Sequence, residues 1–196
     1  MFTKIQLEIM KIFVSKINGK FSIKQIAEII HKQYSPTHRS IKPLIEHNYL
    51  IKDEQDLISL NYRENHPELA LAESFRTQEY LNKNKDFNLF FRDCSKNIKT
   101  DFFIALIFGS SVEKKGGDID LLFIFQENEI EKNEKIIKNI SENFTLKLDI
   151  NTIPIASTYE MFAKRDEINV LNESLNKHLI LFGAESFYRI LDNARK

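Results

Sequence analysis

Residues 103–125 constrain the fold of this chain more than any other segment. The run of large apolar residues at 103–108 is too short for a typical helix and ends at a turn, which predicts a buried strand. The turn at 109–111 begins with glycine, which allows the backbone to approach another group closely. Two further glycines at 116–117 mark a second turn, and residues 118–125 resume as a second strand.

Asp118 and Asp120 are two positions apart on this second strand, so both carboxylates point to the same face of the sheet. Two like charges side by side on an apolar strand repel each other and oppose burial. A divalent cation would relieve this repulsion, and Mg²⁺ is commonly held by one or two carboxylates together with substrate phosphates. The alternative is a pair of carboxylates that caps a turn at a solvated strand end. The Gly-Ser turn upstream favours the cation, because such turns can cradle phosphate.

The order of these features resembles the signature of the polymerase-beta-like nucleotidyltransferase superfamily, and the compact size resembles its minimal nucleotidyltransferase type. The signature consists of an apolar strand, a Gly-Ser pair, a spacer and a strand with two acidic residues. The resemblance implies three acidic catalytic residues that bind Mg²⁺ or Mn²⁺, the third on a later alternating strand, and three small residues that contact a nucleoside triphosphate, with ATP as the first choice. The acidic residues are Asp118, Asp120 and Asp149, and the small residues are Gly109, Ser110 and Ser111.

The implied reaction transfers a nucleoside monophosphate to a hydroxyl of a protein or RNA acceptor and releases pyrophosphate. A second function stays open, that of a DNA-binding transcription regulator whose nucleotidyltransferase domain senses nucleotide or is inactive. The spacer between Ser110 and Asp118 favours it, because it is shorter than this family usually has, and Glu113 stands where a basic residue is more usual. The presence of all three acidic residues favours the enzyme.

Residues 1–62 predict a separate N-terminal domain. Apolar residues at helical spacing predict a first helix over 3–17 and two more helices after it, the third with Ser35 as cap and Pro36 in its first turn. Two short strands are expected within 48–60. Three helices followed by a hairpin resemble a winged helix-turn-helix domain, whose third helix would lie in the major groove of DNA. The exposed residues that this resemblance assigns to DNA binding are Ser35, Thr37, His38, Arg39 and Lys42.

Two alternatives to DNA binding stay open for this domain, a solvated helix face and a surface that docks a protein. Asp53, Glu54 and Asp56 make the predicted hairpin turn acidic, which disfavours close approach to a phosphate backbone. The charge distribution favours DNA, because residues 1–62 hold 9 basic and 6 acidic side chains, whereas residues 63–196 hold 19 and 22.

Residues 63–196 are predicted to form the nucleotidyltransferase domain, with a connector helix over 63–84. The predicted fold class is α/β of the α+β type, in which the winged helix domain is followed by a small mixed sheet flanked by helices. An apolar content of 42% and a charged content of 29% agree with such a globular chain. His178 is predicted to end a helix, where the helix dipole favours it.

The longest apolar runs are far shorter than the roughly 18 residues that a membrane span needs. The N-terminus shows no signal-peptide pattern, so a cytoplasmic protein is expected. The single cysteine, Cys94, excludes a disulfide framework or a zinc cluster within one chain. The expected partners are the nucleotide, DNA, and an acceptor protein, in the toxin–antitoxin arrangement that the minimal type suggests. Membrane is not an expected partner, and a homodimer stays open.

Overall fold

The computed structural model describes residues 2–112 and 118–196. Its N-terminal part contains α1 (Lys4–Ser15), β1 (Lys20–Phe21), α2 (Ile23–Ile29), α3 (Tyr34–Glu46), β2 (Leu50–Lys52) and β3 (Ile58–Leu60). The strands form an antiparallel sheet in the order β1-β3-β2. The three helices and the hairpin were predicted, whereas the two-residue strand β1 was not.

The first residues of α1 and α2 are fixed by side chains within three residues of each helix start. Thr3 and Ser22 each form a capping box. The hydroxyl accepts a bond from the backbone N–H of the glutamine three residues later, and the side-chain oxygen of that glutamine accepts one from the backbone N–H of Thr3 or Ser22. The prediction that Ser35 caps the third helix is wrong. Helix α3 begins two residues earlier than predicted, and Gln33 occupies the cap position without a side-chain hydrogen bond.

The remainder of the chain builds a second sheet. Its elements are α4 (His66–Lys83), α5 (Lys85–Asn97), β4 (Phe103–Phe108), the 3-10 turn η1 (Gly109–Val112), β5 (Ile119–Phe125), η2 (Glu127–Glu129), α6 (Ile130–Ser141), β6 (Leu148–Pro154), α7 (Ile155–Ala163), α8 (Val170–Ser174), β7 (His178–Phe182) and α9 (Ala184–Ala194). The strand order is β6-β5-β4-β7, with β5 and β6 parallel and the other pairs antiparallel. The predicted mixed sheet flanked by helices is confirmed. The predicted turn at 116–117 lies outside the described residues.

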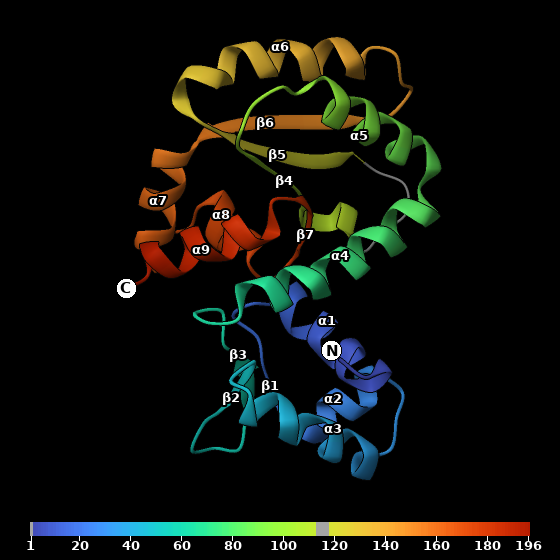
Figure 1. Cartoon of the computed structure of the whole chain (residues 1–196), viewed down its shortest axis with the longest axis vertical. Coiled ribbons are helices and arrows are strands. Elements are labelled where there is room, and N and C mark those ends of the chain that lie inside the picture. Colours follow the sequence, from blue (N-terminus) through green and yellow to red (C-terminus); the bar gives the residue numbers. More distant parts are fainter. Residues whose placement is uncertain (1, 113–117) are drawn as a thin grey trace.

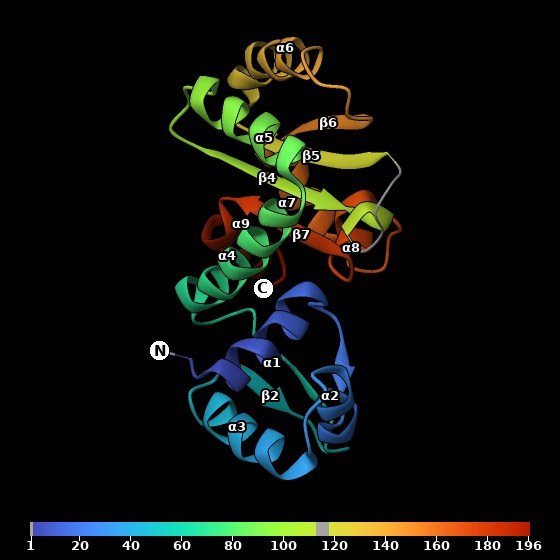
Figure 2. The same ribbon diagram turned by 90° about the vertical axis from the view of Figure 1, so that its right-hand side faces the viewer.

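Helices cover both faces of this sheet (Figures 1 and 2). On one face, the aromatic stripe of α5 packs with α6 against Leu121, Phe123 and Phe125 of β5. On the other face, α7, α8 and α9 pack against Leu122 and Ile124. This alternation follows from the two-residue period of a strand, and it explains why β5 is apolar on both sides.

Helix α4 lies between the two sheets (Figure 1). It contacts α1 on one side and β7 and α9 on the other. The apolar cluster on the α9 face continues through Leu69 and Ala72 of α4 to Ile9 and Phe13 of α1. The division at residue 62 stays a prediction, with α4 at the position predicted for the connector. Across the described residues, no helix has both the length and the apolar character needed to cross a bilayer.

Candidate functional site

The three predicted acidic residues come together at one end of the four-stranded sheet, where β5 and β6 begin and β4 ends. Asp120 pairs with Asp149 in the parallel register of β5 and β6, and with Phe108 of β4 on its other side. Residues that pair across neighbouring strands project their side chains to the same face. Asp118 directly precedes β5, two residues before Asp120. The structure therefore gathers all three carboxylates where β4 ends, next to η1.

Gly109 places this turn directly over one carboxylate. Its φ of +69° lies in the left-handed region that favours glycine, and a Cβ atom there would stand 2.8 Å from Oδ2 of Asp120. Ser110 is exposed. The buried Ser111 hydroxyl donates to the carbonyl oxygen of Phe108 at 3.0 Å, so this hydroxyl stabilises the turn. The close approach of the turn to Asp120 therefore depends on the missing side chain at position 109.

At this end of the sheet, the charges of Asp118 and Asp149 act on Asp120. Burial raises the pKa of the half-buried Asp120 above its ordinary value, and the charges of Asp149 and Asp118 raise this pKa further. Asp118 and Asp149 are exposed and line an open hollow of about 380 Å³, together with Lys147 and Leu148. Lys147 was missed by the sequence analysis, although it lies two residues before Asp149 on the same predicted strand.

The carboxylates at this end of the sheet suit a hard cation, because carboxylate oxygens are the preferred ligands of Mg²⁺. Among the described residues, however, no three His, Cys, Asp or Glu side chains are grouped closely enough to hold a metal ion by themselves. The arrangement fits a cation that is held by Asp118, Asp120 or Asp149 and completed by substrate phosphates. It does not fit a preassembled three-ligand centre.

The predicted DNA-facing residues lie on α3, on the outer side of the N-terminal part (Figures 1 and 2). Ser35, His38, Arg39 and Lys42 are exposed, as expected. The expectation that Thr37 is exposed is wrong, because this residue is fully buried and its hydroxyl donates to the Gln33 carbonyl oxygen at 2.9 Å. The exposed face of α3 is therefore basic and polar without Thr37.

The acidic turn of the hairpin is partly neutralised. Asp53 accepts a bond from Lys20 at 2.9 Å and from two backbone N–H groups of its own turn. Asp56 pairs with Lys52 at 2.5 Å. These two carboxylates therefore oppose a phosphate backbone less than the sequence alone indicated, since each has a lysine beside it.

No protein-family model, curated protein or solved structure matches this chain. The assignment of the site therefore rests on its residues and their geometry.

A buried polar cluster near the turn was not predicted. His178 does not end a helix, as the sequence suggested, but opens β7 and is fully buried. Glu73 of α4 is also fully buried and lies beside it. One signal could have revealed this cluster, because Glu73 falls on the same helical stripe as the buried Leu69 and Thr77.

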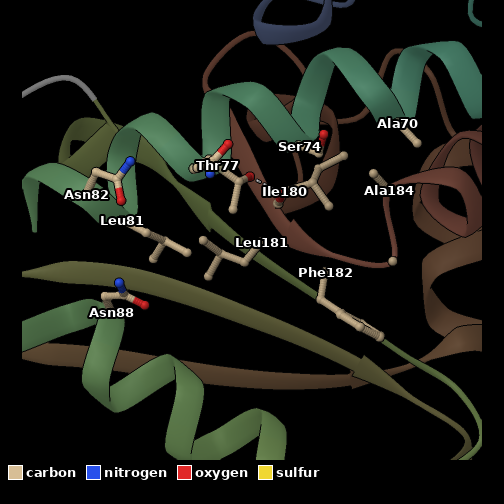
Figure 3. Close-up of a pocket in the computed structure, with 12 residues that line it drawn as sticks. Ala70, Ser74, Thr77, Leu81, Asn82, Asn88, Ile180, Leu181, Phe182 and Ala184 are labelled. Carbon is tan, nitrogen blue, oxygen red and sulfur yellow. Dashed lines mark hydrogen bonds between the residues drawn. The ribbon is translucent and has the colours of Figure 1, made fainter. Parts of the chain in front are cut away.

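A second hollow, of about 450 Å³, lies between α4, the start of α5 and the outer edge of β7 (Figure 3). The Thr77 hydroxyl of α4 donates to the carbonyl oxygen of Ile180 on β7 at 2.6 Å (Figure 3). Asn82 and Asn88 point toward the hollow from the two helices, and Phe182 forms its far end (Figure 3). None of the three aspartates lines it, so this hollow is not part of the candidate site.

Proposed function

We propose that Asp118, Asp120 and Asp149 form the active site of a metal-dependent nucleotidyltransferase. The observation that carries the proposal is the pairing of Asp120 with Asp149 beside a glycine turn that reaches the Asp120 carboxylate. Three acidic side chains at the start of two neighbouring strands, next to a turn that can receive phosphates, suit nucleotide chemistry with a divalent cation. The substrate is a nucleoside triphosphate, with ATP as the first choice.

The aspartates, the turn and Lys147 have different tasks in this reaction. Asp118 and Asp120 would hold Mg²⁺ or Mn²⁺, which would neutralise charge on the triphosphate. The backbone N–H groups of the turn after Gly109 and the exposed Ser110 hydroxyl would receive the phosphates, and Lys147 supplies a positive charge at the rim of the hollow.

The group transfer is an in-line displacement at the α-phosphorus. The acceptor is a hydroxyl of a protein or RNA, whose oxygen forms the new bond to phosphorus. The bond from phosphorus to the oxygen that bridges to the β-phosphate breaks, and pyrophosphate leaves with that electron pair. The exposed Asp149 carboxylate accepts the hydroxyl proton as general base.

Thermal unfolding with ATP, GTP, CTP and UTP, each with and without Mg²⁺, tests the proposal. A nucleotide at about one hundred times its dissociation constant stabilises the folded state by about 2.7 kcal/mol, which corresponds to a rise in Tm of roughly 5–11 °C for a chain of this length. The rise should require Mg²⁺ and vanish in Asp118→Asn. The matched control is Asp101→Asn, an exposed aspartate that precedes the opposite end of β4. A wild-type Tm that no nucleotide changes would contradict the proposal.

A second function, DNA binding through α3, is favoured by the lysines beside the acidic hairpin turn and by the exposed basic face of α3. Fluorescence anisotropy with duplex DNA over a salt series tests it. Arg39→Ala and Lys42→Ala should each reduce the slope of log affinity against log salt by about 1, because each removes one phosphate contact. Arg92→Ala on the exposed side of α5 is the matched control. If the protein binds DNA and no nucleotide changes its Tm, the transcription regulator would be favoured over the enzyme.

A further inference from the structure

Three charged or titratable side chains meet between α4 and β7. Arg76 Nη1 donates to both carboxylate oxygens of Glu73, at 2.8 and 2.6 Å. His178 Nε2 lies 3.2 Å from Oε1 of the same carboxylate. Tyr188 of α9 is the fourth titratable group here, and burial, followed by the charge of Glu73, raises its pKa well above the ordinary value, so this phenol stays neutral.

The contacts of the His178 ring fix its orientation. Nδ1 lies 2.9 Å from the carbonyl oxygen of Ser174, which can only accept, so Nδ1 carries a proton and donates it to this oxygen. On the other side of the ring, Nε2 lies beside the Glu73 carboxylate but forms no hydrogen bond with any of the described residues. The bond to Ser174 therefore orients the ring within the buried cluster.

The same ring lies next to the candidate active site. His178 pairs with Phe108, and Phe108 pairs with Asp120, so one cross-strand row runs from Asp149 through these residues to His178. The residue before His178 also contacts the turn, since Gly109 N–H donates to the Lys177 carbonyl oxygen at 3.2 Å. Whatever fixes the start of β7 therefore also fixes the position of Gly109.

We propose that His178 is a positioning residue, whose bond to Ser174 and contact with the Glu73 carboxylate fix the start of β7 against the Gly109 turn. Arg76 adds to this attachment, because its Nη2 donates to the His178 carbonyl oxygen at 2.7 Å. The proposal deepens the proposed function, since this turn is assigned to the nucleotide phosphates, but its measurements need no nucleotide.

The first measurement is the bond at Nδ1, read from ¹⁵N–¹H correlations of labelled protein. His178→Gln identifies the signals of residue 178 among the five histidines. Wild type should show a proton on Nδ1 that exchanges slowly with solvent, because this nitrogen donates to the Ser174 carbonyl oxygen inside a fully buried ring. A His178 ring without a proton on Nδ1 would overturn the proposal.

The second measurement is hydrogen exchange at the Gly109 amide, with β5 amides as internal reference for global opening. Exchange should become at least about tenfold faster in Glu73→Gln and in His178→Gln, the loss expected for a hydrogen bond supported by charge. The control is Glu79→Gln, which removes an exposed carboxylate of α4 that pairs with Lys11. Equal Gly109 protection in all four proteins would refute the positioning role. Altered protection in a protein that no nucleotide stabilises would sustain it and refute the proposed function.

Discussion

Gly109→Ala tests the geometry of the candidate site most directly, because a single methyl group meets the carboxylate that the site depends on. Holding a non-glycine residue at a φ of +69° costs about 1–2 kcal/mol. The new Cβ would also lie 2.8 Å from Oδ2 of Asp120, so the carboxylate must move. At about 2–4 °C per kcal/mol for a chain of this length, Tm should fall by about 2–8 °C.

The assay compares thermal unfolding with and without a nucleotide and Mg²⁺. Gly183→Ala is the matched control, because Gly183 has a φ of +76° and its Cβ would lie 2.7 Å from the backbone oxygen of Phe103, at the far end of β7. Both variants should lose stability, but only Gly109→Ala should lose the nucleotide-dependent rise in Tm. A full rise in Gly109→Ala would refute the inference that this turn receives the phosphates. An unchanged Tm would refute the strain at position 109.

Three further predictions concern the charges and the core. Asp120→Asn should raise Tm at neutral pH without Mg²⁺, because the raised pKa of Asp120 means that its ionised form costs folding free energy there. This gain should disappear below the ordinary pKa of 3.8, where Asp120 is protonated in both the folded and the unfolded chain; a gain that persists at low pH would contradict it. Arg76→Leu should lower the free energy of unfolding in urea by about 3 kcal/mol, the low end for a broken buried pair, because the Arg76 side chain is still 12% exposed. A loss below about 1 kcal/mol would contradict the cluster. Phe90→Ala should cost about 3–5 kcal/mol in the same urea assay without changing the DNA affinity, because its fully buried ring packs between α5 and the four-stranded sheet.

The helices and strands were largely predictable because their signals are local. The capping boxes at Thr3 and Ser22 and the apolar run of β4 each lie within a few residues of the element they define. The error at Thr37 was avoidable, because Thr37, Ile41 and Leu44 share the buried face of one helix. The strand β1 was missed because two residues carry no periodic pattern and depend on pairing with β3.

The candidate site was predictable in its residue types and less so in its neighbours. The two-residue spacing of Asp118 and Asp120, together with the glycine upstream, was enough to predict a cation and phosphate site at this strand end. The hydroxyl of Ser111, by contrast, turns inward, and Lys147 joins the rim of the hollow. Side-chain direction within a turn depends on the backbone around it, which residue type does not specify.

The sequence by itself therefore determined most of the helices and strands and which strand carries the paired carboxylates, since both depend on residues close together in the chain. Only the tertiary structure placed Asp149 beside Asp120, and only it brought Arg76 to a carbonyl 102 positions away at His178. Such contacts follow from strand register and from the burial of whole helix faces, which are summed over many residues. No short pattern encodes them, so the buried histidine beside Glu73 became visible only in the folded chain.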